Sequence, residues 1–190
     1  MNSKRIVAVI GDNSIESGGT KDHLAQAVGK ALIDAGYRIQ SGGMGGIMNA
    51  VSRGARSSAN YQEGDLIAFV PSFDKTASNQ LADIVVPTGL DINRASLVAN
   101  ADFVVAIGGG AGTLAEICSA WMLYRPIAAF TGVSGWSAKV AGSKLDHRTR
   151  YDFDDYIYAV STAEELMEII AKTVDQYDKY HHQIVMKADR

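Results

Sequence analysis

The chain has 190 residues, of which 47% are hydrophobic and 21% are charged, a composition typical of a globular protein with a well-filled core. Its formal net charge of −3 argues against a nucleic-acid partner, because proteins of that class carry a basic excess. The single cysteine excludes an internal disulfide, and no apolar run is long enough to cross a bilayer. We therefore expect a cytoplasmic protein with one domain over residues 1–190 and no membrane contact.

Short β-branched apolar runs alternate with amphipathic segments from one end of the chain to the other. In chain order the predicted elements are strand Arg5–Ile10, helix Thr20–Ala35, strand Tyr37–Gln40, helix Ile47–Ser58, strands Leu66–Val70 and Ile84–Val86, helix Asn93–Ala101, strand Phe103–Ile107, helix Thr113–Tyr124, strands Ile127–Phe130 and Tyr156–Val160, and a C-terminal helix after a capping box at Ser161-Thr-Ala-Glu164. The stretches 60–65, 73–80 and 131–155 are expected to be rich in loops.

The predicted strands are apolar throughout, which is typical of a parallel sheet that is covered on both faces. Right-handed crossovers then give an α/β fold: a Rossmann-like, doubly wound parallel sheet in three layers, α/β/α. Ligands of such sheets bind beyond the carboxyl ends of the strands. The loops at Gly11, Gly42 and Gly108 each follow a predicted strand, so we expect all three at that edge.

The connection between the strand at 103–107 and the next helix holds four glycines in the five residues 108–112. Glycines let backbone N–H groups approach a ligand closely, and a helix start adds unpaired N–H donors with a partial positive charge. This pattern predicts a phosphate site, whereas packing at a tight turn needs only one or two glycines. The candidate ligand-binding residues here are Gly108, Gly109, Gly110, Ala111, Gly112 and Thr113.

A second glycine-rich connection between a strand and a helix covers residues 41–48. Two such loops at one crevice can hold a phosphate and the sugar beside it, although a structural turn is the simpler alternative. The candidate binding residues are Gly11 after the first strand and Ser41, Gly42, Gly43, Gly45, Gly46 and Met48 in this loop. Packing is the simpler role for the Met48 side chain.

Two charged residues near the Gly108 loop are candidates for catalysis. Arg94 stands at a helix start, where a guanidinium can fork onto phosphate oxygens or order a carboxylate, and a solvated surface charge is the alternative. Glu116 lies one helical turn inside the predicted phosphate cradle, so it suggests a second task beside phosphate binding. Favourable interaction with the helix dipole is its simpler explanation.

Several other site types do not fit the sequence. The Gly108 loop lacks the Lys-Ser/Thr of a P-loop, and no acidic residue after Phe130 can hold the ribose of a bound NAD. The histidines and Cys118 have no metal-ligand spacing, and no nucleophile motif points to acyl transfer. We expect neither a metal nor a resident cofactor.

These residues resemble the LOG family of phosphoribohydrolases within the SLOG superfamily. That family's signature Pro-Gly-Gly-x-Gly-Thr-x-x-Glu is similar to residues 108–116, with Gly108 in the place of the proline. Its motif Gly-Gly-Gly-x-x-Gly-Leu-Met resembles residues 41–48, which read Ser-Gly-Gly-Met-Gly-Gly-Ile-Met. The resemblance covers about residues 5–130, and Thr88-Gly-Leu together with Gly108 looks closest to the molybdenum-cofactor carrier branch.

The resemblance implies cleavage of the N-glycosidic bond of a nucleoside 5′-monophosphate, which frees the base and ribose 5-phosphate. Glu116 would then lie near the ribose and stabilise an oxocarbenium-like centre or orient water. The family's Arg-Lys pair aligns with Asn93-Arg94, so one of its two cations is kept. The alternative is a non-catalytic carrier or sensor of a phosphorylated pterin or nucleotide.

The resemblance also bears on partners. It implies a small phosphorylated ligand and a homodimer or higher homo-oligomer, with contacts from helices beside the glycine loops. Trp121, Met122 and Tyr124 are candidates for that interface, and a place in the core is their alternative.

Overall fold

A computed structural model of the chain describes residues 4–153 and 155–177. Its strands are β1 (Ile6–Gly11), β2 (Arg38–Ser41), β3 (Leu66–Val70), β4 (Ile84–Pro87), β5 (Phe103–Ile107), β6 (Ile127–Phe130) and β7 (Tyr158–Val160). They form one seven-stranded sheet in the order β4-β3-β2-β1-β5-β6-β7, and every neighbouring pair is parallel. The predicted doubly wound α/β fold is confirmed.

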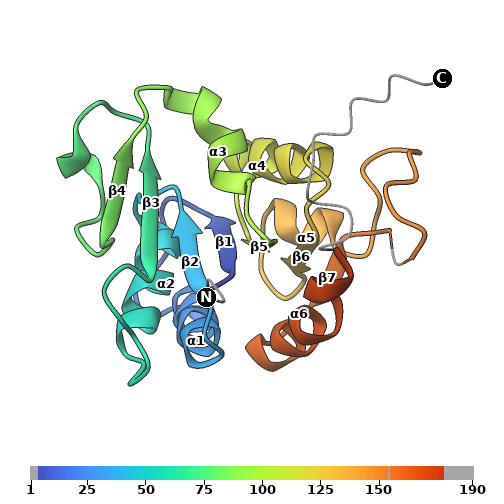
Figure 1. The fold of residues 1–190 in the computed structure, drawn as a ribbon, viewed down its shortest axis with the longest axis horizontal. Helices are drawn as coiled ribbons and strands as arrows, with labels where there is room; N and C mark the ends of the chain where they lie inside the picture. The colour runs from blue at the N-terminus through green and yellow to red at the C-terminus, as the bar shows by residue number, and fades with distance from the viewer. Residues whose placement is uncertain (1–3, 154, 178–190) are drawn as a thin grey trace.

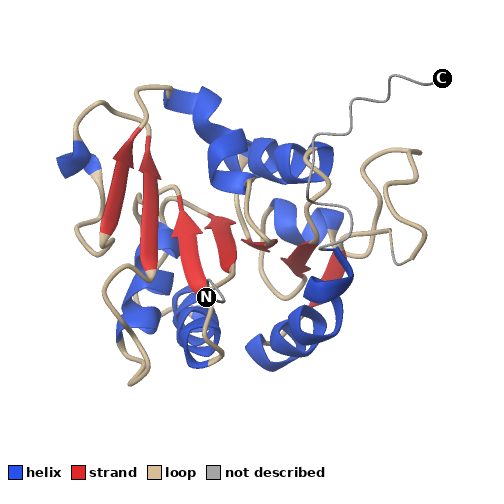
Figure 2. Ribbon diagram, viewed as in Figure 1, coloured by secondary structure: helices blue, strands red, loops and turns tan. Residues whose placement is uncertain are grey.

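Helices cover both faces of this sheet (Figures 1 and 2). One layer holds α1, α2 and α6, and the other holds α3, α4 and α5. The helices are α1 (Thr20–Asp34), α2 (Gly46–Arg56), α3 (Ala95–Ala99), α4 (Ala111–Met122), α5 (Trp136–Val140) and α6 (Ala163–Tyr177), with short 3-10 helices η1 (Lys75–Ala77) and η2 (Asp91–Arg94). No helix within the described ranges is both long and apolar enough to span a membrane.

The central strands β1, β5 and β6 are apolar because each contributes to two cores, whereas β2 includes the buried polar residues Gln40 and Ser41. In β1, Val7 and Val9 face the cluster under α1, α2 and α6, whereas Ala8 and Ile10 face the cluster under α3, α4 and α5. All four side chains are at most 1% exposed. Successive side chains of a strand point to opposite faces, so a strand that is buried on both sides is apolar at nearly every position.

Several predicted boundaries differ from the structure. The helix expected over 93–101 divides into η2 and the shorter α3, and α4 begins at Ala111, two residues before the predicted start. The capping box of α6 lies one residue later than predicted, because the Glu165 N–H donates to Thr162 Oγ1 and the Ser161 N–H donates to the Glu165 carboxylate. The stretches at 73–80 and 131–155, expected to be rich in loops, also contain the short helices η1 and α5.

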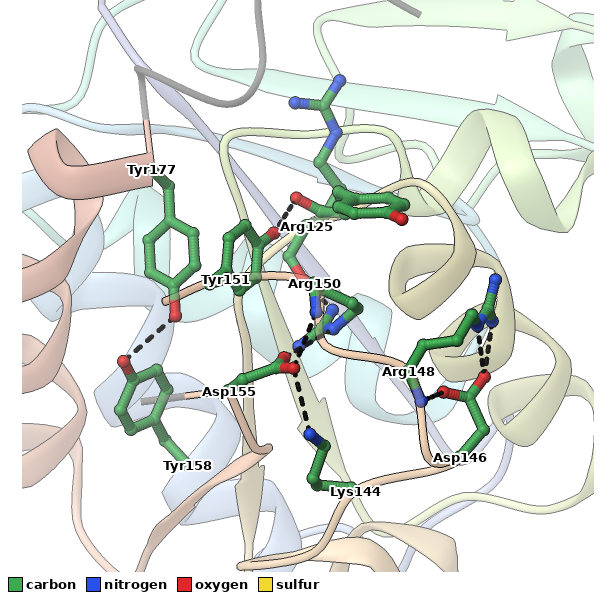
Figure 3. Close-up of polar contacts among 10 residues, drawn as sticks. Arg125, Lys144, Asp146, Arg148, Arg150, Tyr151, Asp155, Tyr158 and Tyr177 are labelled. Atoms are coloured by element: carbon green, nitrogen blue, oxygen red, sulfur yellow. Dashed lines mark hydrogen bonds and ion pairs between the residues drawn. The ribbon is translucent and has the colours of Figure 1, made fainter. Parts of the chain in front are cut away.

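The segment that follows α5 is anchored at the amino edge of the sheet, just before β6 (Figure 3). Arg150 forms an ion pair with Asp155 at 2.9 Å, stacks over the Trp121 ring at 3.3 Å and donates to the Arg125 carbonyl. Lys144 reaches the same Asp155 carboxylate at 3.2 Å. Because Arg125 precedes β6, these contacts hold Lys144, Arg150 and Asp155 near the amino end of β6, at the opposite end of the strand from the glycine loops.

Candidate functional site

The topology brings the three glycine-bearing loops to one place. β1 pairs with β2 on one side and with β5 on the other, and all three strands are parallel. Their carboxyl ends, Gly11, Ser41 and Ile107, therefore lie side by side at one edge of the sheet. The strand order reverses between β1 and β5, and this switch point is where sheets of this type hold their ligands.

Hydrogen bonds tie the loop after β1 to both helix starts. The Thr113 hydroxyl donates to the Gly11 carbonyl at 3.0 Å, on the α4 side. On the α2 side, the Ile47 N–H donates to the Asp12 carbonyl at 2.9 Å, and the Gly45 N–H donates to Asn13 Oδ1 at 3.2 Å. The two glycine-rich loops thus meet at the switch point, with the β1 loop between them, and we refer to the place that they border as the crevice.

The Ser41 loop forms a closed wall of this crevice. Ser41, Gly42 and Gly43 are buried, and the Gly43 N–H donates to Ser41 Oγ at 3.1 Å. Gly46 has a φ of +55°, and a Cβ atom placed there would lie 2.1 Å from the Asp12 carbonyl oxygen. Glycine is required at this position for close packing, and the amides of Gly43, Gly45 and Ile47 are already bonded within the protein.

The Gly108 loop, by contrast, is open where it enters α4. Gly110, Ala111 and Gly112 are exposed, and a Cβ atom added to Gly110 or Gly112 would meet no atom within 4 Å. No side chain caps the helix. Among the residues that the structure describes, none accepts a hydrogen bond from the N–H groups of 109–113. These unpaired donors lie at the positive end of the helix dipole, and three of the five residues are exposed, whereas Gly109 and Thr113 are buried.

The start of α5 is hydrogen-bonded to the buried part of this loop, Gly108 and Gly109. Ser137 Oγ accepts from the Gly108 N–H and donates to the Phe130 carbonyl, both at 2.8 Å. The Trp136 and Ser137 N–H groups donate to the carbonyls of Gly109 and Gly108 at 2.9 and 3.0 Å. Sequence reasoning missed α5 and Ser137, and the small residues after Phe130 carried no motif that identifies them.

Arg94 reaches from η2 into the wall of the crevice. Its Nε donates to the Phe69 carbonyl at 2.9 Å, and its Nη1 donates to the Asp91 carbonyl at 3.2 Å. A Cβ atom placed on Gly42 would lie 3.0 Å from Nη2 of Arg94 and 3.2 Å from Sδ of Met48. Met48 is 7% exposed, which agrees with a packing role. Two backbone carbonyls therefore hold the guanidinium against the Ser41 loop.

Glu116 is partly buried on α4 and has no hydrogen-bond or ion-pair partner among the described residues. Removal from water raises the pKa of its carboxyl to about 7, and the nearby positive charge of Arg94 opposes that rise. The two predicted catalytic residues are thus close enough to interact electrostatically. A carboxyl with a pKa near neutrality and no structural partner is typical of a functional site.

Two charged residues of the crevice were not singled out from the sequence. Lys21, in the first turn of α1, forms an ion pair with Asp12 at 2.5 Å, directly against Gly108. Both lie in or beside the polar loop after β1, where spacing along the chain gives no sign that they meet the Gly108 loop.

Comparison with known families supports the superfamily resemblance. A family model described as the SLOG cluster4 family matches residues 4–172. The chain belongs to the SLOG cluster4 family. The match supports the superfamily inferred from the loop motifs and does not extend to the LOG family within it. A protein of Archaeoglobus fulgidus is 33% identical over 98 residues, which span 51% of this chain and 62% of the archaeal protein.

Solved structures share the fold of this SLOG cluster4 protein over nearly their whole length. The X-ray structure of TM1055 has a TM-score of 0.74 and 29% identity, covering 90% of this chain and 99% of that one. The molybdenum cofactor binding protein of Rippkaea orientalis has a TM-score of 0.71 and 22% identity, with 92% and 99% covered. The molybdenum cofactor carrier protein of Chlamydomonas reinhardtii has a TM-score of 0.69 and 22% identity, with 89% and 98% covered.

Proposed function

We propose that this SLOG cluster4 protein binds a small phosphorylated molecule in the crevice between β1 and β5, with the phosphate on the N-terminus of α4. The observation that carries the proposal is the run of N–H groups at residues 109–113 that have no partner among the described residues, at a helix start that no side chain caps. Such a start is a ready anion site because donors and dipole act together. The Ser41 loop and Arg94 then form the wall beside the sugar or ring of the ligand.

The reaction that we propose is hydrolysis of a nucleoside 5′-monophosphate. Water adds at the anomeric carbon, the N-glycosidic bond breaks, and the base leaves with a proton. Glu116, one turn beyond the free amides, acts as a carboxylate that stabilises the oxocarbenium-like centre or orients the water. Arg94 keeps Nη2 free of any hydrogen bond within the described residues, so it has a donor left for the ligand.

Release of ribose 5-phosphate from a panel of nucleoside 5′-monophosphates tests this reaction. We expect turnover that rises with pH through about 7, because the carboxylate form of Glu116 is the active one. E116Q should abolish turnover and keep phosphate affinity, whereas E164Q, at an exposed glutamate of α6, should leave both unchanged. Binding without release from any member of the panel would rule out hydrolysis.

The second candidate function is that of a carrier for a phosphorylated pterin. The two molybdenum-cofactor proteins share the fold, and Gly108 and Asn93 depart from the hydrolase motifs. In this case Glu116 and Arg94 hold the ligand and do not act on it. A pterin that co-purifies with the protein and absorbs in the near ultraviolet would support the carrier. An apo protein without affinity for a pterin phosphate would exclude it.

The same proposal includes a homodimer through α3 and α4, which pack side by side in one layer (Figure 1). Trp121 is 1% exposed and belongs to the core, whereas Met122 is 59% exposed. Leu90, Ile92 and Leu97 add exposed apolar side chains around η2 and α3. Exposed apolar side chains on neighbouring elements favour a protein contact.

A further inference from the structure

The ion pair between Asp12 and Lys21 occupies the space beside Gly108. A Cβ atom placed on Gly108 would lie 2.2 Å from Asp12 Oδ2 and 2.8 Å from Lys21 Nζ. The pair itself measures 2.5 Å, and its side chains are 24% and 22% exposed. A carboxylate and an ammonium group therefore lie directly against the backbone that leads to the free amides of α4.

This arrangement accounts for glycine at position 108. The residue has a φ of +65°, which proline cannot adopt because its ring fixes φ near −65°. Any side chain here would also displace the Asp12–Lys21 pair. Glycine in place of the proline of the Pro-Gly-Gly signature therefore leaves the room that the ion pair occupies.

The Lys21 ammonium group has hydrogen-bond donors that are not used within the described residues. An ammonium group carries three N–H donors, and within the described residues its only bonded partner is Asp12. Gly108 is next to Gly109, the first residue of the run of free amides. Lys21 thus has donors left for an anion beside Gly108 while it stays paired with Asp12.

We propose that Lys21 is the side-chain cation that binds the phosphate of the ligand, and that Asp12 is a positioning residue that holds Lys21 over Gly108. The inference rests on the proposed function, and it adds a selectivity for phosphate monoesters over neutral nucleosides. Without Lys21, the carboxylate of Asp12 would repel the phosphate. The pair therefore turns an acidic position into one that accepts an anion.

Titration calorimetry with adenosine 5′-monophosphate, adenosine and inorganic phosphate tests the role of Lys21. We expect K21M to weaken binding of the nucleotide and of phosphate by about tenfold to a hundredfold, in line with the loss of a hydrogen bond to a charged group. Adenosine affinity should not change. K30M is the matched control, because Lys30 lies on the same helix and pairs with exposed Asp34, so its effect should stay under about twofold.

The double variant D12N/K21M separates the attraction of the phosphate by Lys21 from its repulsion by Asp12. It should bind the nucleotide more tightly than K21M does, because the unpaired Asp12 charge is gone, and less tightly than the native protein. K21R keeps the charge and should bind within a few-fold of the native protein. A folded K21R that binds as weakly as K21M would overturn the inference.

A measurement on the native protein covers the case in which K21M does not fold. The side-chain NMR signals of Lys21 should shift on addition of the nucleotide or of inorganic phosphate, and those of Lys30 should not. A native protein that binds the nucleotide while Lys21 stays unaffected overturns the role of Lys21 and leaves the proposed function intact. A native protein that binds neither the nucleotide nor phosphate overturns both.

Discussion

Gly108 and Gly112 stand four residues apart, one in the loop before α4 and one in its first turn, and their surroundings differ. Gly108 has a positive φ and is crowded by Asp12 and Lys21, whereas a side chain on Gly112 would project into open space. Gly112 also lies within α4, where alanine is the better helix former. A glycine that neither backbone strain nor packing requires is best explained by the approach of a ligand.

We predict that G112A stabilises the protein and weakens ligand binding. The free energy of unfolding should rise by about 0.5–1 kcal/mol, because alanine loses less backbone entropy in a helix. Phosphate and nucleotide affinity should fall by about tenfold, since overpacking a tight contact costs about 1–3 kcal/mol. Denaturant unfolding and titration calorimetry measure the two effects.

The control is G108A, which should lower stability because it combines a left-handed backbone with a clash against Asp12. A G112A variant with native affinity would mean that the phosphate does not contact this part of the loop.

Glu116 should make the stability of the protein depend on pH. Its pKa is raised from 4.5 to about 7 on folding, so between these values the folded state binds more protons than the unfolded state. Stability contributed by this group is therefore lost as pH rises through that window. We predict that E116Q becomes more stable relative to the native protein as pH goes from 5 to 7.5, by on the order of 1–3 kcal/mol.

Unfolding curves at a series of pH values measure this difference, with E164Q as a control that should show no such trend. An E116Q difference that stays flat with pH would show that the carboxyl is ionised in the folded state throughout the range.

At the scale of elements, α5 supports the site although it contributes no predicted ligand contact. Ser137 is 0% exposed and makes two side-chain hydrogen bonds that connect the Gly108 loop to the end of β6. We predict that S137A leaves the Gly108 N–H and the Phe130 carbonyl without a partner and lowers stability by about 1–3 kcal/mol. Ligand affinity should fall with it, because the loop loses its support.

The comparison is S143A, which removes a single bond from a serine hydroxyl to the Val140 carbonyl at the end of α5. S143A should keep native affinity. Equal loss of affinity in both variants would mean that α5 as a whole, and not Ser137, holds the loop.

Most elements followed from the sequence, because buried parallel strands are largely apolar. The strands β3, β5 and β6 have the predicted bounds. The short α5 was missed, since five residues give no helical periodicity. The glycine loops were located by their place after strands. The contacts of Asp12, Lys21 and Ser137 with Gly108 could not be predicted, because crossovers of the fold bring them together from distant segments.

At the scale of the whole molecule, the proposed ligand crevice and the exposed apolar side chain of Met122 lie in different places. The crevice is at the carboxyl edge of the sheet, while Met122 lies at the far end of α4. We predict that M122E shifts a homodimer toward the monomer, because a charge would be buried in an apolar contact. Light scattering after size exclusion measures the mass.

Q176E, on the opposite layer at the end of α6, should leave the mass of the particle unchanged. An M122E protein with the mass of the native protein would place any contact between copies elsewhere on the surface.

The most direct test follows the backbone amides of the 15N-labelled protein by NMR while adenosine 5′-monophosphate or inorganic phosphate is added. The largest shifts should occur at the N–H groups of Gly109, Gly110, Ala111, Gly112 and Thr113, because these donors would bond the phosphate. Elsewhere, a hollow between β7 and α6 is lined by Tyr156, Lys172 and Gln176, among others. Shifts that gather there and leave residues 109–113 unchanged would contradict phosphate binding at the start of α4.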